Sequence, residues 1–233
     1  MSQSPELFPR KSDFAYSRLR EKILSGEYEP GTVLNQAVLA RTIGISTTPL
    51  REALRRLKSE GLVELDAHRD ARVTPLSAEE ARDLLEIRGS LDPLAAALAA
   101  ERRSTADIRE MREAIQGLQP LPSNPAFVDL VAHRRFHTAI YTASHNEILI
   151  STLDALWDKA DRYRRFGLEV VRSQEERDEK AAEHEALLRC VISGDAAGAA
   201  EVMHRHIGTS LGAKAASRLG TQQFAATAQE PHV

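Results

Sequence analysis

A change in sequence pattern at Pro75 does most to limit how this chain can fold. Before Pro75, short helical patterns alternate with short extended segments and glycine turns. After it, Ala, Leu, Glu and Arg recur with helical spacing as far as Arg218, starting from the N-cap signal at Ser77. A mainly α fold with two domains is therefore expected. The expected boundaries are 1–12 for a flexible tail, 13–76 for the first domain, 77–216 for an all-helical second domain and 217–233 for a disordered tail.

The first domain combines three helical patterns with three short extended segments. Gly44 allows a tight turn between the second and third helices, and Ser46 is placed to cap the third. The last two extended segments form a hairpin with its tip at Asp66–Asp70. This order is that of a winged helix-turn-helix. The helices are expected over 14–25, 36–43 and 46–60, and the extended segments over 32–34, 62–65 and 71–74.

The helix that begins at Ser46 has the features of a helix that reads DNA. Short hydroxyl side chains and free backbone N–H groups at its start suit phosphate contacts, and arginines follow along it. Residues 1–76 hold 12 Lys and Arg against 10 Asp and Glu, although the whole chain has a net charge of −3. A small helical bundle with a basic solvent face would share these features. The candidate DNA-contacting residues are Ser46, Thr47, Thr48, Arg51, Arg55 and, in the hairpin tip, Arg69.

Residues 18–73 resemble the DNA-binding domain of the GntR family of transcriptional regulators. The matching motifs are Ser25-Gly26-Glu27, Pro30-Gly31, Leu39-Ala40, Gly44-Ile45-Ser46, Pro49-Leu50-Arg51-Glu52-Ala53-Leu54 and Glu60-Gly61-Leu62-Val63. The resemblance implies that Ser46, Thr48 and Arg51 contact operator DNA and that Asp66–Asp70 forms the wing. The chain departs from the family pattern at three positions. Thr47 and Ala37 stand where arginine is usual, and Asp70 stands where glycine is usual. We therefore expect an operator sequence that differs from the family's usual one.

Four of the eight histidines are spaced so that three helices can direct them to one point. His133 and His137 are four residues apart and share one helix face, with Asp129 one turn earlier. His184 and His206 lie in two later helices. Histidines that only satisfy buried hydrogen bonds would show the same spacing, so the spacing alone leaves both interpretations open.

The second domain, over about residues 78–215, resembles the FCD domain found in the fatty-acid-regulator branch of GntR proteins. The matching stretches are His133-Arg134-Arg135-Phe136-His137, Ser144-His145-Asn146, Glu183-His184, Ser193-Gly194-Asp195 and His206-Ile207. In that domain one Asp and three His commonly hold a metal ion. The resemblance assigns the three histidines to His137, His184 and His206, and the Asp position to His133. Six helices are expected, over residues 78–101, 105–117, 126–143, 147–168, 173–193 and 196–215. This number favours a vanillate-regulator-like subgroup.

The histidine at the aspartate position changes the expected metal chemistry. Four neutral imidazoles leave the full charge of a divalent ion and favour Zn²⁺, with Ni²⁺ as the second choice, over Mn²⁺. Asp129 is an alternative ligand, beside or in place of His133.

The resemblance also implies an effector cavity for a small carboxylate-bearing metabolite. Arg88 is the candidate carboxylate clamp, and an ion pair with Asp92 one helical turn away is the alternative. The other candidate effector-binding residues are Tyr141, Asn146 and Arg162, of which Asn146 can equally cap a helix.

Composition narrows the class of protein further. No apolar run approaches the roughly 18 residues that a membrane span needs, and the N-terminus lacks the apolar core of a signal peptide. The lone Cys190 excludes an internal disulfide and suits a reducing cytoplasm. One DNA-binding domain reads only a half-site, so a homodimer on palindromic operator DNA is expected. Two alternatives are a direct metal sensor and a metal-dependent enzyme; the sequence has no His-Glu-x-x-His motif to favour the enzyme.

We predict that Arg51→Ala weakens binding to operator DNA by about 1–3 kcal/mol, because Arg51 is placed to pair with a base. Fluorescence anisotropy at matched salt measures this change. An unchanged dissociation constant would remove Arg51 from the reading surface.

Overall fold

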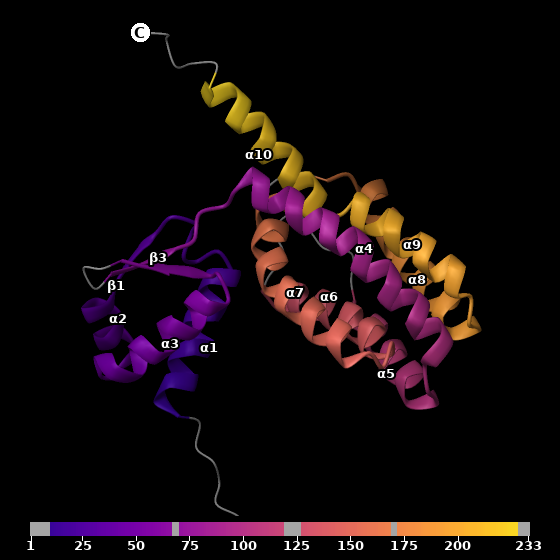
Figure 1. The fold of residues 1–233 in the computed structure, drawn as a ribbon, viewed down its shortest axis with the longest axis horizontal. Coiled ribbons are helices and arrows are strands. Elements are labelled where there is room, and N and C mark those ends of the chain that lie inside the picture. Colours follow the sequence, from indigo (N-terminus) through magenta and orange to yellow (C-terminus); the bar gives the residue numbers. More distant parts are fainter. Residues whose placement is uncertain (1–9, 67–69, 119–126, 169–171, 228–233) are drawn as a thin grey trace, which may run out of the picture. The chain divides into compact units, whose positions relative to one another are not determined.

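The chain folds into two compact units, Met1–Pro75 and Leu76–Val233. A computed structural model describes residues 10–66, 70–118, 127–168 and 172–227 (Figure 1). Residues 1–9 of the tail predicted over 1–12, and the wing residue Arg69, lie outside these ranges. The end of that predicted tail is wrong, because Lys11 already belongs to the first helix. The first unit contains α1 Lys11–Leu24, β1 Val33–Asn35, α2 Gln36–Ile43, α3 Thr47–Ser59, β2 Val63–Leu65 and β3 Asp70–Val73.

The first unit is a winged helix-turn-helix, as predicted. Its strands form an antiparallel sheet in the order β1-β3-β2. Gly44 ends α2 with a φ of 77°, a left-handed conformation that a side chain would strain, so the chain turns directly into α3. Leu50, Leu54 and Leu57 of α3 and Leu19 of α1 are fully buried. The apolar face of α3 thus anchors the helix and leaves its polar face outside.

Asp70 has a structural role that its predicted place at the wing tip did not indicate. It is the first residue of β3 and pairs with Asn35 of β1. The Asn35 side-chain amide donates to the Asp70 carboxylate at 3.0 Å, and its oxygen accepts from the N–H of Val38 as the N-cap of α2. The carboxylate therefore holds the residue that starts the helix-turn-helix.

The second unit contains seven helices within the described residues, not the predicted six. The helix expected over 196–215 is divided, because the Ser210 hydroxyl accepts from the N–H of Ala213 and caps a new helix. That last helix continues through residues 217–227, where a disordered tail was predicted, and its Ala215 and Ala216 are buried. The helices are α4 Ala78–Arg102, α5 Thr105–Gln116, α6 Phe127–Thr142, α7 Glu147–Gly167, α8 Gln174–Ser193, α9 Ala196–Gly208 and α10 Leu211–Thr227.

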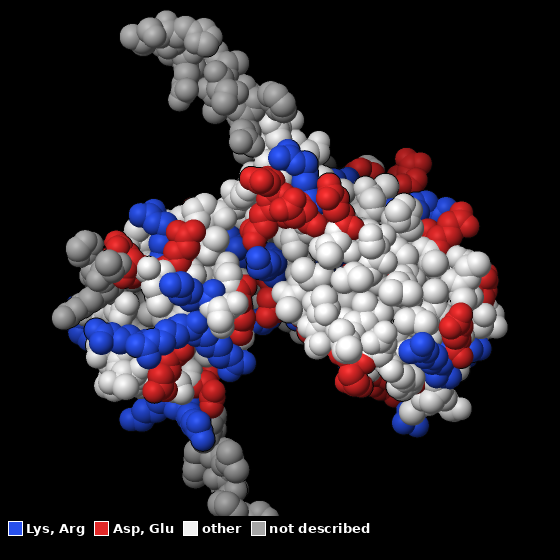
Figure 2. Space-filling view, in the orientation of Figure 1, with Lys and Arg blue, Asp and Glu red and all other residues white. Residues whose placement is uncertain are grey.

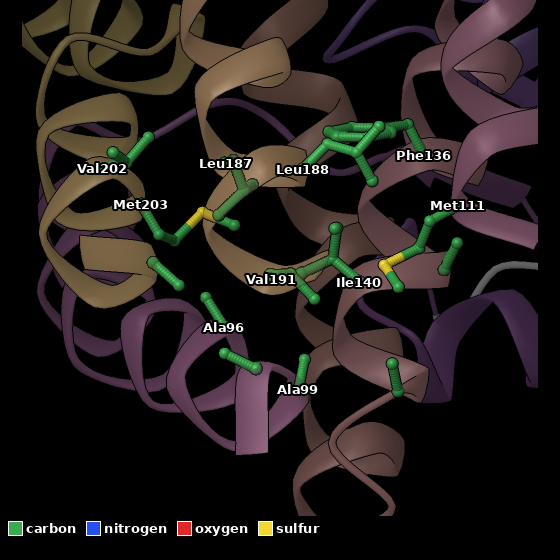
Figure 3. Close-up of a cluster of buried hydrophobic side chains, with 14 of the residues drawn as sticks. Ala96, Ala99, Met111, Phe136, Ile140, Leu187, Leu188, Val191, Val202 and Met203 are labelled. Carbon is green, nitrogen blue, oxygen red and sulfur yellow. The ribbon is translucent and has the colours of Figure 1, made fainter. Parts of the chain in front are cut away.

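The core of the second unit lies where α4, α6, α8 and α9 meet (Figure 3). On α4, Ala96 and Ala99 are fully buried, and these small side chains let α9 pack closely along α4. Leu187 and Val191 of α8 and Phe136 of α6 fill the other side of this cluster. Among the described helices, none is long and apolar enough to cross a membrane.

Pro93 in the middle of α4 creates a further link to α9. A proline has no N–H, so the carbonyl oxygen of Gly89, one turn earlier, loses its usual helical donor. The Nδ1 atom of His204 lies 3.3 Å from this oxygen and can donate to it. Residues two apart on a helix face in different directions. His204 is therefore held against α4 while His206 points into the unit.

Candidate metal centre and DNA-reading surface

The structure brings His133, His137, His184 and His206 together in the interior of the second unit. The first two project from α6, and the others come from α8 and α9. All four are at least nine-tenths buried. One ring nitrogen of each lies within 4.8 Å of those of the other three. The described histidines that converge are thus the four that the spacing and the FCD resemblance indicated, and Asp129 is not part of the group.

Several ring nitrogens of this cluster have no hydrogen-bond partner among the described residues. They are Nδ1 of His133, both nitrogens of His137 and Nε2 of His184. An unsatisfied buried polar atom costs about 1–3 kcal/mol, so four in one place require an explanation. A metal ion explains three of them, one on each ring, because it would take up the single lone pair of each neutral imidazole. The second nitrogen of His137 carries a proton, which a metal ion does not satisfy. The four imidazole donors suit a divalent transition metal ion that accepts nitrogen ligands.

Glu183 orients the fourth ring. The Nδ1 atom of His206 lies 2.8 Å from the Glu183 carboxylate, which can only accept, so this nitrogen carries the proton. The Nε2 lone pair is then free for the cluster, as in many metal-bound histidines. Burial raises the pKa of Glu183, but hydrogen bonds from His206 and Lys180 outweigh it and lower the pKa to about 2. Glu183 therefore carries a negative charge one residue away from His184.

Burial keeps the imidazoles neutral. It is the main cause that holds the pKa values of His133, His137 and His184 well below the ordinary 6.5, and it also lowers the pKa of His206. The positive charge of Arg164 and the neighbouring rings lower the pKa of His133 further. At neutral pH all four rings can offer lone pairs, which is the protonation state that metal binding requires.

A cavity of about 1290 Å³ adjoins the four histidines, which form part of its lining. Arg88 also lines it, from α4. Its Nε and Nη2 atoms donate to the two carboxylate oxygens of Asp92 at 3.1 and 3.0 Å. The intrahelical ion pair is therefore present, and Nη1 makes no hydrogen bond to any described residue. The pair leaves both N–H groups of Nη1 and one of Nη2 for a ligand.

The other three predicted effector-binding residues do not line this cavity. Tyr141 is buried and donates to the carboxylate of Asp154. Asn146 is the N-cap of α7 and accepts a hydrogen bond from a backbone N–H in the first turn. Arg162 is buried near Glu80, whose pKa its charge helps to lower. All three serve the packing or capping of α7.

Two residues of α7 that sequence reasoning left unassigned do line the cavity. Trp157 and Arg164 are seven residues apart and so lie on one helix face, whereas Arg162 points elsewhere. The Nε1 atom of Trp157 and the Nη2 atom of Arg164 are buried without a hydrogen-bond partner among the described residues. The seven-residue spacing of these two side chains indicates that they share a helix face. The sequence does not show that this face lies beside the histidine cluster.

In the first unit, the start of α3 is open to solvent. Ser46 occupies the N-cap position, but its hydroxyl makes no capping hydrogen bond. Arg51 contacts Gln36 with its Nε atom at 3.3 Å. Figure 2 shows Lys and Arg side chains in a band across this unit. The described candidate DNA-contacting residues are all exposed: Ser46, Thr47, Thr48, Arg51 and Arg55.

Arg56, by contrast, is used within the fold. Its guanidinium lies 3.6 Å from the ring centre of Tyr16 in α1 and pairs with Glu60. Stacking of this kind fixes α1 against α3. The arginines available to DNA on α3 are therefore Arg51 and Arg55.

Comparison with known proteins agrees with both units. Residues 11–73 match the model of the bacterial regulatory proteins of the gntR family, and residues 83–209 match the FCD domain. The chain is 29% identical over 202 residues to the HTH-type transcriptional repressor GlaR of Escherichia coli (strain K12), covering 84% of this chain and 92% of GlaR. It is 30% identical over 207 residues to the HTH-type transcriptional regulator LutR of Bacillus subtilis (strain 168), covering 79% and 92% of the two chains.

A solved structure shares the fold over most of the chain. The structure of E. coli McbR/YncC superposes with a TM-score of 0.75 at 24% identity, covering 93% of this chain and all of that one. The FCD match alone spans more than half of the chain. The chain therefore belongs to the FCD-containing branch of the GntR family and is a DNA-binding transcriptional regulator.

Proposed function

We propose that this regulator holds one divalent transition metal ion on His133, His137, His184 and His206, and that a small carboxylate-bearing metabolite bound beside the ion controls its affinity for operator DNA. The observation that carries the proposal is the group of buried, neutral ring nitrogens that lack partners among the described residues. The all-nitrogen set favours Zn²⁺, and Ni²⁺ next.

The charge of the site supports an anionic effector. Four neutral imidazoles do not reduce the two positive charges of the ion, and the Glu183 carboxylate beside His206 offsets only one of them, so an anion in the cavity beside the ion would be stabilised. Arg88 offers a further donor from the cavity wall. The cavity of about 1290 Å³ is larger than the usual 300–1,000 Å³ of a small-molecule site and leaves space for a metabolite and water. The proposal for effector binding keeps Arg88 and leaves out Tyr141, Asn146 and Arg162.

We propose that the protein binds a palindromic operator in the cytoplasm as a homodimer. Each α3 reads one half-site, so two copies are needed for the whole site. Figure 2 shows a nearly uncharged surface over α4 and α7 of the second unit. Ile87 and Leu94 of α4 and Ile148 of α7 are exposed, Ile148 by 80%. This α4–α7 face is the surface that we assign to the second copy.

A direct metal sensor is the second candidate function. It is favoured by the fact that the four histidines need no group from a ligand to hold an ion. The vanillate-regulator-like subgroup is not part of our proposal, because it rested on six helices in the second domain, and the described residues of the second unit form seven.

We expect the untagged native protein to contain one metal ion per chain and His137→Ala to contain much less, because the variant removes a central ligand. His204→Ala is the matched control: His204 lies on α9 beside the cluster but bonds to Gly89, so this variant should keep the metal. Elemental analysis and competition with a zinc chelator measure both.

The same proteins test the function. DNA from a selected operator pool should bind metal-loaded protein with an affinity that changes when carboxylates are added, and His137→Ala should lose this response. A response to metal alone would assign the metal-sensor function. Full metal occupancy in His137→Ala, or a native chain without metal, would contradict the site.

We expect metal-free protein to lose stability as pH falls from 7 to 5. The folded pKa values of the cluster lie below 6.5, so the unfolded chain binds protons that the folded chain cannot, and falling pH favours unfolding. Each such histidine contributes a slope of up to about 1.4 kcal/mol per pH unit. Urea unfolding in chelator measures the slope, which His184→Gln should reduce and His204→Ala should not. An equal slope in the native protein, His184→Gln and His204→Ala would show that the buried histidines do not cause the loss of stability at low pH.

We expect Leu94→Asp to convert the dimer into monomers, because it places a charge in the α4–α7 face. Val128→Asp is a control of the same chemistry at another exposed apolar position, 66% exposed on α6. Sedimentation equilibrium measures the mass, and binding to a full palindrome should weaken only for Leu94→Asp. A native monomer, or a dimeric Leu94→Asp protein, would rule out this face.

A further inference from the structure

In the first unit, a series of side-chain contacts runs from the start of β3 to α3. The carboxylate of Asp70, the first residue of β3, accepts from the Asn35 amide at 3.0 Å. Asn35 is the N-cap of α2, and its amide oxygen accepts from the N–H of Val38 at 3.0 Å. The side-chain oxygen of Gln36, the next residue, accepts from the Nε atom of Arg51 at 3.3 Å. Asn35 and Gln36 thus connect the base of the wing with the helix that carries the candidate DNA contacts.

The backbone fixes Asp70, where this series begins. Asp70 pairs with Asn35 in the antiparallel ladder of β1 and β3. Its carbonyl oxygen accepts from the N–H of Asp66 at 3.0 Å, which closes the hairpin between β2 and β3. Among the described residues other than glycine, only His145 has a positive φ, so an aspartate fits this position without backbone strain. A glycine here would have no side chain with which to hold Asn35.

Gln36 is the one hydrogen-bond partner of Arg51 among the described residues. An arginine on a helix can also be held by an acid three or four positions away. On α3 these positions hold no acid: they are Thr47, Thr48, Leu54 and Arg55. A long side chain that must become ordered when a complex forms reduces the affinity of that complex. The contact with Gln36 orders Arg51 before DNA binds.

The same contact selects the edge of the guanidinium that remains available. Nε has a single proton and donates it to Gln36, whereas Nη1 and Nη2 each have two and donate to none of the described residues. In the major groove, guanine presents two acceptors, O6 and N7, that pair with two N–H groups of one arginine. With Nε engaged, Arg51 would meet a guanine through Nη1 and Nη2 together.

We propose that Asp70, Asn35 and Gln36 are positioning residues that hold Arg51 in the orientation in which its two Nη atoms read a guanine. The inference rests on the base-reading role predicted for Arg51, which Arg51→Ala tests separately. Asp70 then acts on DNA in two opposite ways. Its charge repels phosphate and weakens binding to every sequence, while its hydrogen bond to Asn35 improves discrimination between sequences.

Two substitutions separate these effects. Asp70→Asn removes the charge but keeps an oxygen that can accept from Asn35, whereas Asp70→Ala removes both. The two variants should therefore gain the same affinity for non-operator DNA. Only Asp70→Ala should lose discrimination. Glu64→Ala is the matched control, because Glu64 is an exposed acid of the same sheet on β2, and this variant should keep the native discrimination.

Operator sequences are selected from a random DNA pool with the full native chain, and each base pair of the consensus is then changed in turn. Fluorescence anisotropy at one salt concentration gives the ratio of the dissociation constants for changed and unchanged DNA. Arg51→Ala should abolish this discrimination at a guanine of each half-site. At that guanine, we expect Asp70→Ala and Gln36→Ala to reduce the ratio about 3–10-fold, a part of the roughly 5–150-fold that a good bidentate pair contributes. Asp70→Asn should keep the native ratio.

A double variant shows whether the residues act through Arg51. In Arg51→Ala protein, Gln36→Ala should cause no further loss of discrimination, because two changes in one series of contacts are not additive. A further loss, or native discrimination in both Gln36→Ala and Asp70→Ala, would overturn the proposal. Equal losses in Asp70→Asn and Asp70→Ala would assign the effect to charge and overturn it as well. If Asp70→Ala does not fold, Gln36→Ala decides. A consensus without any position that depends on Arg51 would overturn the role of Arg51 and the proposal together.

Discussion

The burial of four neutral imidazoles inside a helical bundle is the constraint around which the second unit is arranged. Each ring carries a lone pair that water would normally satisfy, and three of the four rings have buried nitrogens with no partner among the described residues. Such groups weaken a fold unless a ligand completes them. The stability of the second unit should therefore depend on whether a ligand completes these nitrogens.

The packing of α4 against α9 places this cluster. Small alanine side chains on α4 let α9 lie close, and the Gly89 carbonyl left free by Pro93 fixes His204 on one side of α9. His206 then faces inward, where Glu183 sets its tautomer. On α7, one helix face carries Trp157 and Arg164 to the same cavity. Local packing and hydrogen bonding thus determine which of several histidines and arginines reach the site.

Much of the fold could be predicted from sequence because its signals are local. The helix-turn-helix follows from Gly44 and the leucine spacing of α3, and these predictions are confirmed. The break at Ser210 was missed, since a serine within an Ala-rich pattern is a weak signal until its hydroxyl is seen to cap α10. The helical end of the chain was also missed, because glycine and polar residues there suggested a tail, whereas Ala215 and Ala216 are buried against the unit.

The candidate site, too, could be predicted from the sequence only in part. Histidine spacing left two interpretations open, and the family resemblance chose the four that converge. Arg162 and Arg164 have the same chemistry and nearly the same position, and only the helix packing distinguishes the one beside Glu80 from the one in the cavity. The sequence does not identify the partners of Tyr141 and Asn146, because a polar residue near a motif does not reveal what it contacts. Their partners, Asp154 and a backbone N–H, are short-range contacts within the fold.

Anomalous diffraction at the zinc absorption edge, from crystals of the zinc-loaded protein, tests the central claim most directly. The account predicts one strong peak per chain at about 2.0–2.1 Å from one nitrogen of each of His133, His137, His184 and His206. A peak bound through Asp129 without His133, or peaks only on the protein surface, would contradict it.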